Sequence, residues 1–246
     1  MSTYRWSQAQ FAAGYDAAAE FIHPRYTELQ HKIIELLPFS EDQQFLLVDA
    51  GGGSGRLVAM ILDRYPYAQA VVVDQSEPFL ALAAERMRPF AGRGQTLVSR
   101  LQEDWLARLP APPDVVVSMS SIHHLTPDEK LVLYQRIHDA LKPGGVLMNG
   151  DEVRPADDAT YLAELKAWDL HMRQRLETGE IPAEMTEILD VWRDKNLTHF
   201  GEPRKSGDDC HETVAVQLEY FRHVGFVEVD APWQQEMWAI LRGRKA

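Results

Sequence analysis

The most informative part of this sequence is Val48-Asp49-Ala50-Gly51-Gly52-Gly53-Ser54-Gly55-Arg56. An apolar run, Phe45 to Ala50, leads into it, and a helical pattern from Arg56 to Tyr65 follows it. Glycines between a strand and a helix let the backbone turn with positive φ and let a ligand approach more closely than any Cβ would allow. Ligands of open α/β sheets bind beyond the carboxyl ends of the strands. The stretch therefore predicts a strand, a tight turn and a helix that bind a nucleotide-like ligand.

The spacing of these glycines disfavours two common nucleotide loops. A dinucleotide fingerprint needs G-x-G-x-x-G, and no register that starts at Gly51, Gly52 or Gly53 supplies it. A P-loop needs a terminal Gly-Lys-Ser/Thr, which does not follow. The glycines instead alternate at Gly51, Gly53 and Gly55, two residues after an acid, Asp49. An NAD-dependent oxidoreductase is therefore disfavoured but remains an alternative.

Outward from this stretch, the chain alternates short apolar runs with helical patterns. Nearly continuous apolar runs indicate strands covered on both faces, as in a parallel sheet between two helical layers. The expected strands are 45–50, 70–74, 96–99, 114–118, 146–149, 226–230 and 237–241, and the expected helices between them are 56–65, 77–90, 127–141 and 212–224. The fold class is therefore α/β, a Rossmann-like, doubly wound, mostly parallel sheet of seven strands.

Two helical regions interrupt this alternation. Residues 1–40 contain amphipathic helices that break near His23-Pro24, and residues 155–200 contain a long helical insertion divided around Gly179 and Pro182. We expect the first region to form an N-terminal helical cap and the second to form a helical lid. Residues 41–154 and 201–246 are then expected to form the ligand-binding domain.

Composition and charge narrow the possible partners. The 246 residues are 45% hydrophobic and 25% charged, which suits one large α/β domain. The 37 acids against 25 Lys and Arg give a formal charge of −12, which repels phosphate backbones, so nucleic acid is not expected. The N-terminus is unlike a signal peptide, and no run approaches a membrane span. We expect a cytoplasmic protein with no membrane partner, and we leave a homodimer open.

From about Phe45 to Leu241 the motifs, taken in order, resemble those of class I S-adenosylmethionine (SAM) dependent methyltransferases of the small-molecule type. The first motif of that family, hydrophobic-Asp-x-Gly-x-Gly-x-Gly, matches Val48 to Gly55. An acid at the tip of the second strand, which binds the ribose, is matched by Asp74, and an acid that meets the adenine amino group is similar to Asp104. The resemblance implies SAM as cofactor, S-adenosyl-L-homocysteine (SAH) as product and methyl transfer as the activity.

The resemblance also implies a set of residues that contact the cofactor. On the strands and the turns after them, these are Asp49, Ala50, Gly51, Gly53, Gly55, Asp74, Gln75, Glu103, Asp104, Trp105, Ser118 and Met119. On the N-terminal segment, Tyr15 and Arg25 are candidates to meet the methionine carboxylate. Alternatives stay open: Asp74 could cap a helix, Trp105 could pack in the core instead of stacking on adenine, and Tyr15 could belong to a packing face.

Methyl transfer from sulfur requires an aligned acceptor, exclusion of water and, for an oxygen or protonated nitrogen acceptor, removal of a proton. His123 and His124 follow the fourth strand, and Asp151 and Glu152 follow the fifth. All four are expected at the mouth of the sheet as candidate catalytic residues, with His124 as the first candidate for the base. Structural roles, a buried hydrogen-bonded histidine or an N-capping acid, are the alternatives.

The lid and the segments beside it supply candidates for contacts with the acceptor. The expected substrate-binding residues are Tyr26, Trp168, His171, His199 and His211. Each could instead be a packing or surface residue. The reaction needs no metal in principle and we expect none, although Asp208, Cys210 and His211 could form a metal site by residue type.

The residues at the end of the fourth strand limit the possible classes of methyl acceptor. Ser118-Met119-Ser120-Ser121 lacks the Asn/Asp-Pro-Pro-aromatic motif that grips an extruded base, and it lacks the acids of the metal-dependent catechol type. We therefore expect O- or N-methylation of a small molecule. A SAM-modifying enzyme similar to carboxy-SAM synthase and a non-catalytic SAM- or SAH-binding protein remain alternatives.

Overall fold

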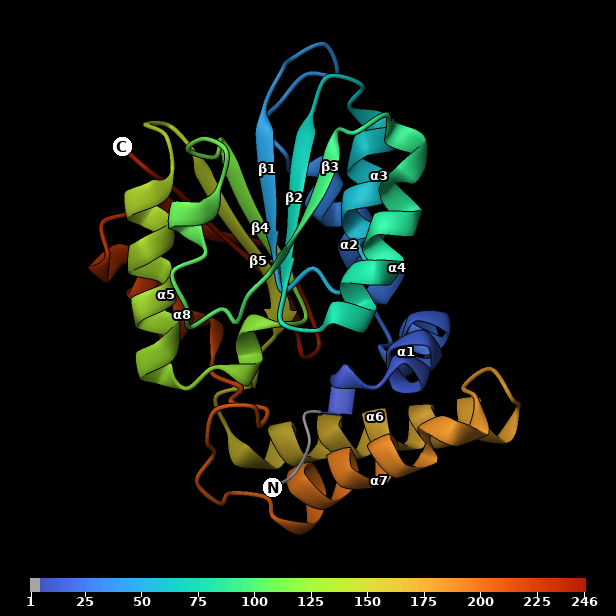
Figure 1. The fold of residues 1–246 in the computed structure, drawn as a ribbon. Helices are drawn as coiled ribbons and strands as arrows, with labels where there is room; N and C mark the ends of the chain where they lie inside the picture. The colour runs from blue at the N-terminus through green and yellow to red at the C-terminus, as the bar shows by residue number, and fades with distance from the viewer. Residues whose placement is uncertain (1–4) are drawn as a thin grey trace.

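A seven-stranded sheet forms the centre of the computed structural model, which describes residues 5–246 (Figure 1). The strand order is β3-β2-β1-β4-β5-β7-β6. The strands are β1 (Leu46–Ala50), β2 (Gln69–Asp74), β3 (Gly94–Val98), β4 (Val115–Met119), β5 (Val146–Glu152), β6 (Val227–Gln235) and β7 (Trp238–Arg244). The expected mostly parallel α/β sheet is confirmed.

The pairing of the strands brings their carboxyl ends to one edge. In the parallel pairs, Val48 of β1 lies opposite Val71 of β2 and Val116 of β4. β3 and β5 continue the parallel sheet, while β7 lies antiparallel between β5 and β6. Five parallel strands therefore end together, and the loops that follow them form a common mouth.

Helices cover both faces of the sheet. One face is covered by α2 (Tyr26–Glu35), α3 (Arg56–Arg64) and α4 (Glu77–Met87), and the other by α5 (Pro127–Ala140) and α8 (Val214–His223) (Figure 1). Neighbouring residues of β1 belong to different cores: Leu47 packs with the first set of helices and Val48 with the second. This burial on both faces explains why the central strands are nearly all apolar.

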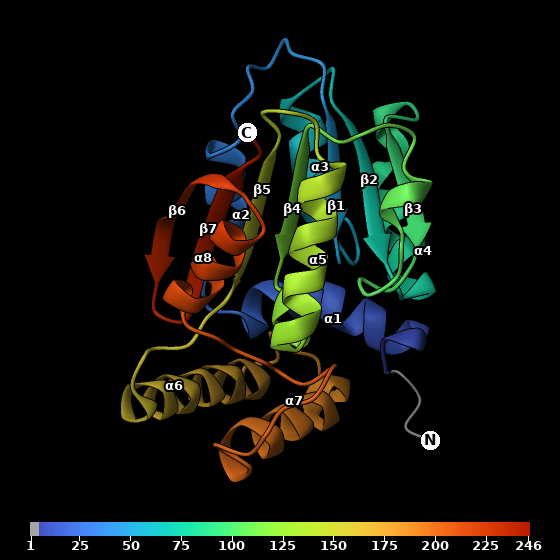
Figure 2. The ribbon, with the colours of Figure 1, turned by 90° about the vertical axis from the view of Figure 1, so that its left-hand side faces the viewer.

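Three more helices lie beyond the carboxyl ends of the strands (Figures 1 and 2). They are α1 (Ala9–Ile22), α6 (Asp158–Glu177) and α7 (Thr186–Arg193). The Trp168 indole of α6 donates a hydrogen bond to the carbonyl of Ile22 at 2.7 Å, so the insertion is attached to the N-terminal helix. Within residues 5–246, no helix is both long enough and apolar enough to cross a membrane.

The expected cap is divided in the structure. α1 lies at the mouth, but α2 packs on the sheet, where Leu29 and Ile33 contact Gly150 of β5 closely. Residues 1–4 of the expected cap lie outside the described residues. The cap thus contributes one helix to the mouth and one to the helical layer.

Some element boundaries also differ from the expectation. β5 runs to Glu152 rather than ending at Asn149, because β7 pairs Ala239 with Asp151 and Trp238 with Glu152. In the helical insertion, the part after Pro182 is divided into a short 3₁₀ turn (Ala183–Met185), α7 and a π-turn (Asp194–Thr198). A partner strand far along the chain sets the end of β5, and local periodicity could not reveal it.

Candidate functional site

The glycine loop after β1 adopts the geometry that its sequence predicts. Gly51, Gly53 and Gly55 have φ values of 75°, 52° and 72°, in the region that side chains disfavour. The N–H of Gly51 donates to the carbonyl of Val73 at 2.8 Å, which fixes the turn against β2. A Cβ added at Gly53 would meet nothing within 4 Å. The loop therefore faces open space at the residue where the cofactor is expected to approach.

Two acids flank this loop. Asp49 is 2% exposed, and its Oδ1 has no hydrogen-bond partner among the described residues. Burial, reinforced by the charge of Asp74, raises the pKa of Asp49 to about 7. Asp74 Oδ2 accepts the Gly53 N–H at 3.1 Å, and its Oδ1 accepts the Ser76 N–H at 2.8 Å. Burial raises the pKa of Asp74, and these backbone hydrogen bonds partly oppose that effect.

The two acids fit an adenosyl cofactor in different ways. The unpartnered Asp49 oxygen is suited to a cationic or N–H donor, because a buried acceptor without a donor is costly. Each Asp74 oxygen retains a lone pair that could accept a hydroxyl. The helix that follows Asp74 is capped by the Ser76 hydroxyl, which accepts the Phe79 N–H at 3.2 Å. Asp74 is therefore not needed as the helix cap.

Asp16 of α1, which is not among the expected site residues, closes the other side of the loop. Its Oδ1 accepts hydrogen bonds from the Ser54 hydroxyl at 2.5 Å and from Arg56 Nε at 2.9 Å. Its Oδ2 accepts from Arg86 at 2.8 Å. Burial raises the pKa of Asp16, but these bonds outweigh it and the pKa is lowered. The N-terminal helix is thus attached to the glycine loop by a charged network.

The other candidate residues of the N-terminal segment, Tyr15, Arg25 and Tyr26, have different surroundings. The Tyr15 hydroxyl lies 2.7 Å from His23 Nε2, and the Tyr26 ring stacks on His23. Tyr26 is half-buried; desolvation raises its pKa to about 12, and the charges of Asp16 and Asp49 add to this effect while Arg56 opposes it. Arg25 instead pairs with Glu236 at 2.8 Å and with Glu28. The expected contact between Arg25 and a carboxylate of the cofactor is not supported, because its guanidinium is already engaged by acids.

Two expected cofactor contacts are corrected by burial. Trp105 is 0% exposed within the core formed with α5, so neither face of its ring is free to stack on adenine. Ser118 is also 0% exposed, and its hydroxyl donates to the Ala50 carbonyl at 2.7 Å. Both residues support the sheet instead.

The remaining expected cofactor contacts vary in exposure. Ala50 is buried in β1, Met119 is partly buried at the end of β4, and Gln75 and Asp104 are exposed. Glu103 is exposed as well, and its carboxylate accepts a hydrogen bond from the Ser99 hydroxyl at 3.0 Å. Their contacts with the cofactor stay predictions.

All four expected catalytic residues meet in one group at the mouth. His123 lies on a 3₁₀ turn (Ile122–His124) after β4, and its Nδ1 is 2.6 Å from Asp151 Oδ1. Asp151 Oδ2 also accepts the His123 backbone N–H at 2.8 Å. Asp151 therefore fixes both the position and the ring orientation of His123.

Glu152 is the centre of this group. Its Oε2 is 3.1 Å from His211 Nε2 and 3.6 Å from His123 Nε2. Its Oε1 has no hydrogen-bond partner among the described residues, although His23 Nδ1 lies 3.5 Å away. Burial, opposed by His123 and reinforced by Asp209, raises the pKa of Glu152 to about 8. Burial lowers the pKa of His211 to about 4 and that of His23 to about 3, so both rings are neutral.

Asp209, which was not chosen as a site residue, completes the group. Its Oδ1 is 3.3 Å from His124 Nδ1 and 3.9 Å from His123 Nε2. The side chain of His124 is 44% exposed, and it is the most accessible member. We call His123, His124, Glu152, Asp209 and His211 the histidine–carboxylate cluster. The Asp208-Asp209-Cys210-His211 run was the available sequence signal for Asp209.

The expected lid residues have other surroundings. Trp168 is buried against His23, Trp192 and Trp238, and His171 Nε2 bonds the Phe21 carbonyl at 2.8 Å. His199 is exposed and pairs with Glu202. Trp168 contacts His23, which lies beside Glu152. The expected contacts of Trp168, His171 and His199 with the acceptor stay predictions.

The three residues that could form a metal site by residue type, Asp208, Cys210 and His211, do not point at a common centre, because each has a different partner. Asp208 pairs with Lys195, the Cys210 thiol bonds the Lys205 carbonyl, and His211 joins Glu152.

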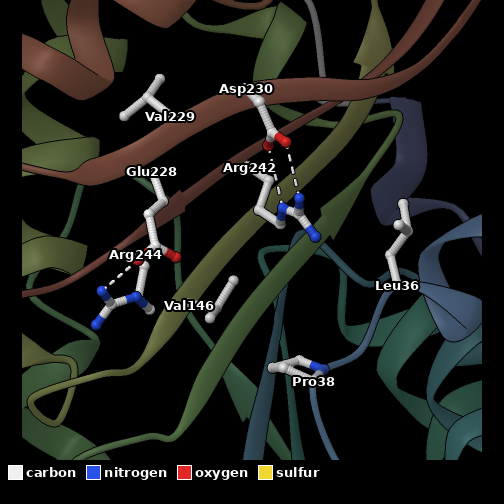
Figure 3. Close-up of a pocket in the computed structure, with 8 residues that line it drawn as sticks. All are labelled: Leu36, Pro38, Val146, Glu228, Val229, Asp230, Arg242 and Arg244. Atoms are coloured by element: carbon white, nitrogen blue, oxygen red, sulfur yellow. Dashed lines mark hydrogen bonds and ion pairs between the residues drawn. The ribbon is translucent and has the colours of Figure 1, made fainter.

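A surface pocket of about 370 Å³ lies away from the mouth (Figure 3). Its lining includes Val146, the first residue of β5, and the pairs Glu228–Arg244 and Asp230–Arg242. The length of β5 separates this pocket from Glu152. It therefore does not belong to the candidate site.

Residues 48–147 match the family described as a methyltransferase domain. The chain is 26% identical over 162 residues to phenazine O-methyltransferase PhzM of Lysobacter antibioticus, a match that covers 66% of this chain and 46% of that protein. It is 24% identical over 214 residues to carboxy-S-adenosyl-L-methionine synthase of Hydrogenovibrio crunogenus, covering 85% of this chain and 82% of that one.

Solved structures agree on the fold. An O-methyltransferase family protein from Burkholderia thailandensis superposes with a TM-score of 0.67 at 16% identity, covering 98% of this chain and 62% of that one. The chain thus spans 46% of the phenazine enzyme and 62% of the Burkholderia protein. At this identity, the likeness concerns the fold alone.

Proposed function

Residues 48–147 belong to the SAM-dependent class I methyltransferases, and from that premise we propose that the chain transfers a methyl group from SAM to an oxygen or nitrogen atom of a small molecule. The observation that carries the proposal is the unpartnered, buried Asp49 oxygen beside a glycine loop that opens onto free space. A loop of this form receives an adenosyl group without a steric clash, and the buried acceptor requires a donor.

Three groups of this chain would hold the cofactor. Gly53 leaves room for it, Asp74 would accept the ribose hydroxyls, and Asp49 would accept a hydrogen bond from the methionine ammonium group. Tyr26, expected to contact the acceptor, is better placed to cover the cofactor side, since it lies near Asp16 and Asp49. SAM, when bound, supplies a methyl group already activated on a sulfonium.

The cluster at the ends of β4 and β5 would receive the acceptor. His124 is its most accessible side chain, and Asp209 Oδ1 lies 3.3 Å from its Nδ1 as an ion-pair partner. We assign to His124 the removal of the acceptor proton, since it can contact a molecule entering the mouth. The α1 and α6 helices beyond the mouth would exclude water from the reacting atoms.

The test separates the cofactor from the reaction. Calorimetry with SAM, SAH and NAD is expected to give binding of SAM and SAH only, and binding of NAD alone would overturn the proposal. Incubation with methyl-labelled SAM and a panel of phenols, hydroxy acids and amines should then transfer label to one class. SAM binding without transfer to any acceptor would favour a non-catalytic binding protein.

One alternative has support of its own. The match to carboxy-SAM synthase covers 85% of this chain, more than the match to the phenazine enzyme covers. Mass spectrometry of the SAM pool after incubation distinguishes the two reactions. A carboxylated SAM product would replace methyl transfer as the function.

A further inference from the structure

We propose that His123, Glu152 and His211 of the histidine–carboxylate cluster bind a divalent transition-metal ion, with Asp209 beside them. These ligands come from the turn after β4, from the end of β5 and from the segment before α8. The inference departs from the expectation of no metal, and it uses a different set of residues from the Asp208, Cys210 and His211 combination.

The spacing of the donor atoms suits a metal. Bonds of about 2.0–2.2 Å place neighbouring ligand atoms about 3–3.5 Å apart. Glu152 Oε2 lies 3.1 Å from His211 Nε2 and 3.6 Å from His123 Nε2, and one ligand atom from each of the three residues lies within 4.8 Å of the others. Small side-chain adjustments would therefore bring all three atoms onto one ion.

Both imidazoles are held with the required nitrogen facing inward. Metal-binding histidines usually donate their other ring N–H to an outer partner, which fixes the tautomer. His123 Nδ1 is 2.6 Å from Asp151 Oδ1, and His211 Nδ1 is 2.8 Å from the Tyr161 hydroxyl. In the tautomer in which each Nδ1 carries the proton and donates it to its outer partner, each Nε2 directs a lone pair toward Glu152.

The acids of the site also favour a cation. Asp151, Glu152 and Asp209 bring three carboxylates together, and two of them are at most 2% exposed. In residues 5–246 their ion pairs are made with histidine rings alone, without lysine or arginine. Lys130, the nearby buried amine, is engaged by Glu212 and the Cys210 carbonyl. A buried carboxylate group is costly without a compensating charge, and a divalent ion supplies it.

The donor set indicates the class of metal. Two imidazoles and one carboxylate suit Fe(II), Zn(II) and related ions, whereas Mg(II) prefers oxygen ligands. Three protein ligands leave coordination positions of the metal open for a small molecule. An acceptor oxygen bound at such a position would have its pKa lowered, and this catalytic role of the metal rests on the function proposed above. Metal binding itself does not depend on that role.

The experiment uses the full chain without an affinity tag, stripped with a chelator and dialysed. Calorimetric titration with Zn(II), with Fe(II) under anaerobic conditions and with Mg(II) is expected to give one site per chain for the transition metals and at least about 100-fold weaker binding of Mg(II). Glu152→Gln and His211→Ala should each weaken Zn(II) binding by about 100-fold, and His31→Ala, which changes an exposed histidine of α2, should not.

A second measurement covers variants that fail to fold. Wild-type protein loaded with Co(II) should show two hyperfine-shifted, exchangeable ring N–H signals in its NMR spectrum, from His123 and His211, which disappear in D₂O. Absence of stoichiometric Zn(II) or Fe(II) uptake, absence of those signals, or equal weakening by His31→Ala would overturn the proposal. SAM calorimetry on the stripped protein keeps the two failures apart, since loss of SAM binding would count against the proposed function alone.

Discussion

The glycine loop and the histidine–carboxylate cluster lie at the same edge of the sheet, but they are assembled differently. The loop is one continuous segment, and its two acids lie on neighbouring strands that pair directly, with Asp49 opposite Val72. The cluster draws on the ends of β4 and β5 and on residues 209 and 211, with His23 of the N-terminal segment beside it. A site made from one segment follows from sequence spacing, whereas a site made from several depends on how the chain packs.

The loop would lose the most from a single substitution. Gly53→Val should abolish SAM binding, because the side chain would fill the open space that the cofactor needs. Gly144→Val is the matched control: Gly144 also has positive φ, at 77°, with nothing within 4 Å of an added Cβ. Calorimetry should therefore give no SAM binding for the first variant and unchanged affinity for the second. Equal SAM affinity in both variants would place the cofactor elsewhere.

The cluster should respond in rate rather than in cofactor affinity. His124→Ala should slow methyl transfer by about 10²–10⁴-fold, the usual contribution of a general base, and leave SAM affinity unchanged. Single-turnover kinetics and calorimetry measure the two quantities separately. His223→Ala, at an exposed site on α8, should leave both unchanged. Full activity of His124→Ala would remove this residue from the mechanism.

Asp74 tests the other end of the cofactor. Asp74→Ala should weaken SAM binding by about 1.5–3 kcal/mol, the range for a hydrogen bond to a charged group. Ser76→Ala removes the nearby helix cap, so it should lower stability by about 1 kcal/mol without a matching loss of affinity. If the Asp74 variant binds SAM as tightly as wild type does, the ribose is held by other groups.

The titration of Asp49 gives the smallest expected change in SAM affinity per step of the experiment. Its pKa of about 7 means that the carboxylate loses its charge below neutrality, so SAM affinity should fall by about tenfold per pH unit below pH 7. Asp49→Asn should bind SAM weakly with a flat profile over this range. A wild-type profile that is equally flat would exclude Asp49 as the partner of the ammonium group.

The same shift predicts the direction of a stability change. A carboxyl whose pKa is raised in the folded state binds more protons there than in the unfolded chain between about pH 4 and 7, so its contribution to stability falls as pH rises through that window. The unfolding free energy of Asp49→Asn relative to wild type should therefore increase from pH 4 to pH 7. A constant difference would contradict this assignment.

Individual residues illustrate which features of the fold and the site can be predicted from the sequence and which cannot. Thr126 and Glu129 form the capping box that starts α5, and both lie within four residues, so local chemistry was sufficient. The sequence allows Trp105 either to stack on adenine or to pack in the core, and only its complete burial decides against stacking. Arg25 was placed beside the cofactor by residue type, whereas Glu236, 211 positions away, engages it.

Hydrophobic periodicity, turn chemistry and capping act over a few residues, so the α/β order, the glycine turn and the acids near the ends of the first two strands follow from local sequence. The packing of distant segments brings His123, Glu152 and His211 together, places Asp209 beside them and lays α2 on the sheet. Those contacts depend on strand register and on the return of the chain from the insertion, where the burial of distant segments sets the geometry.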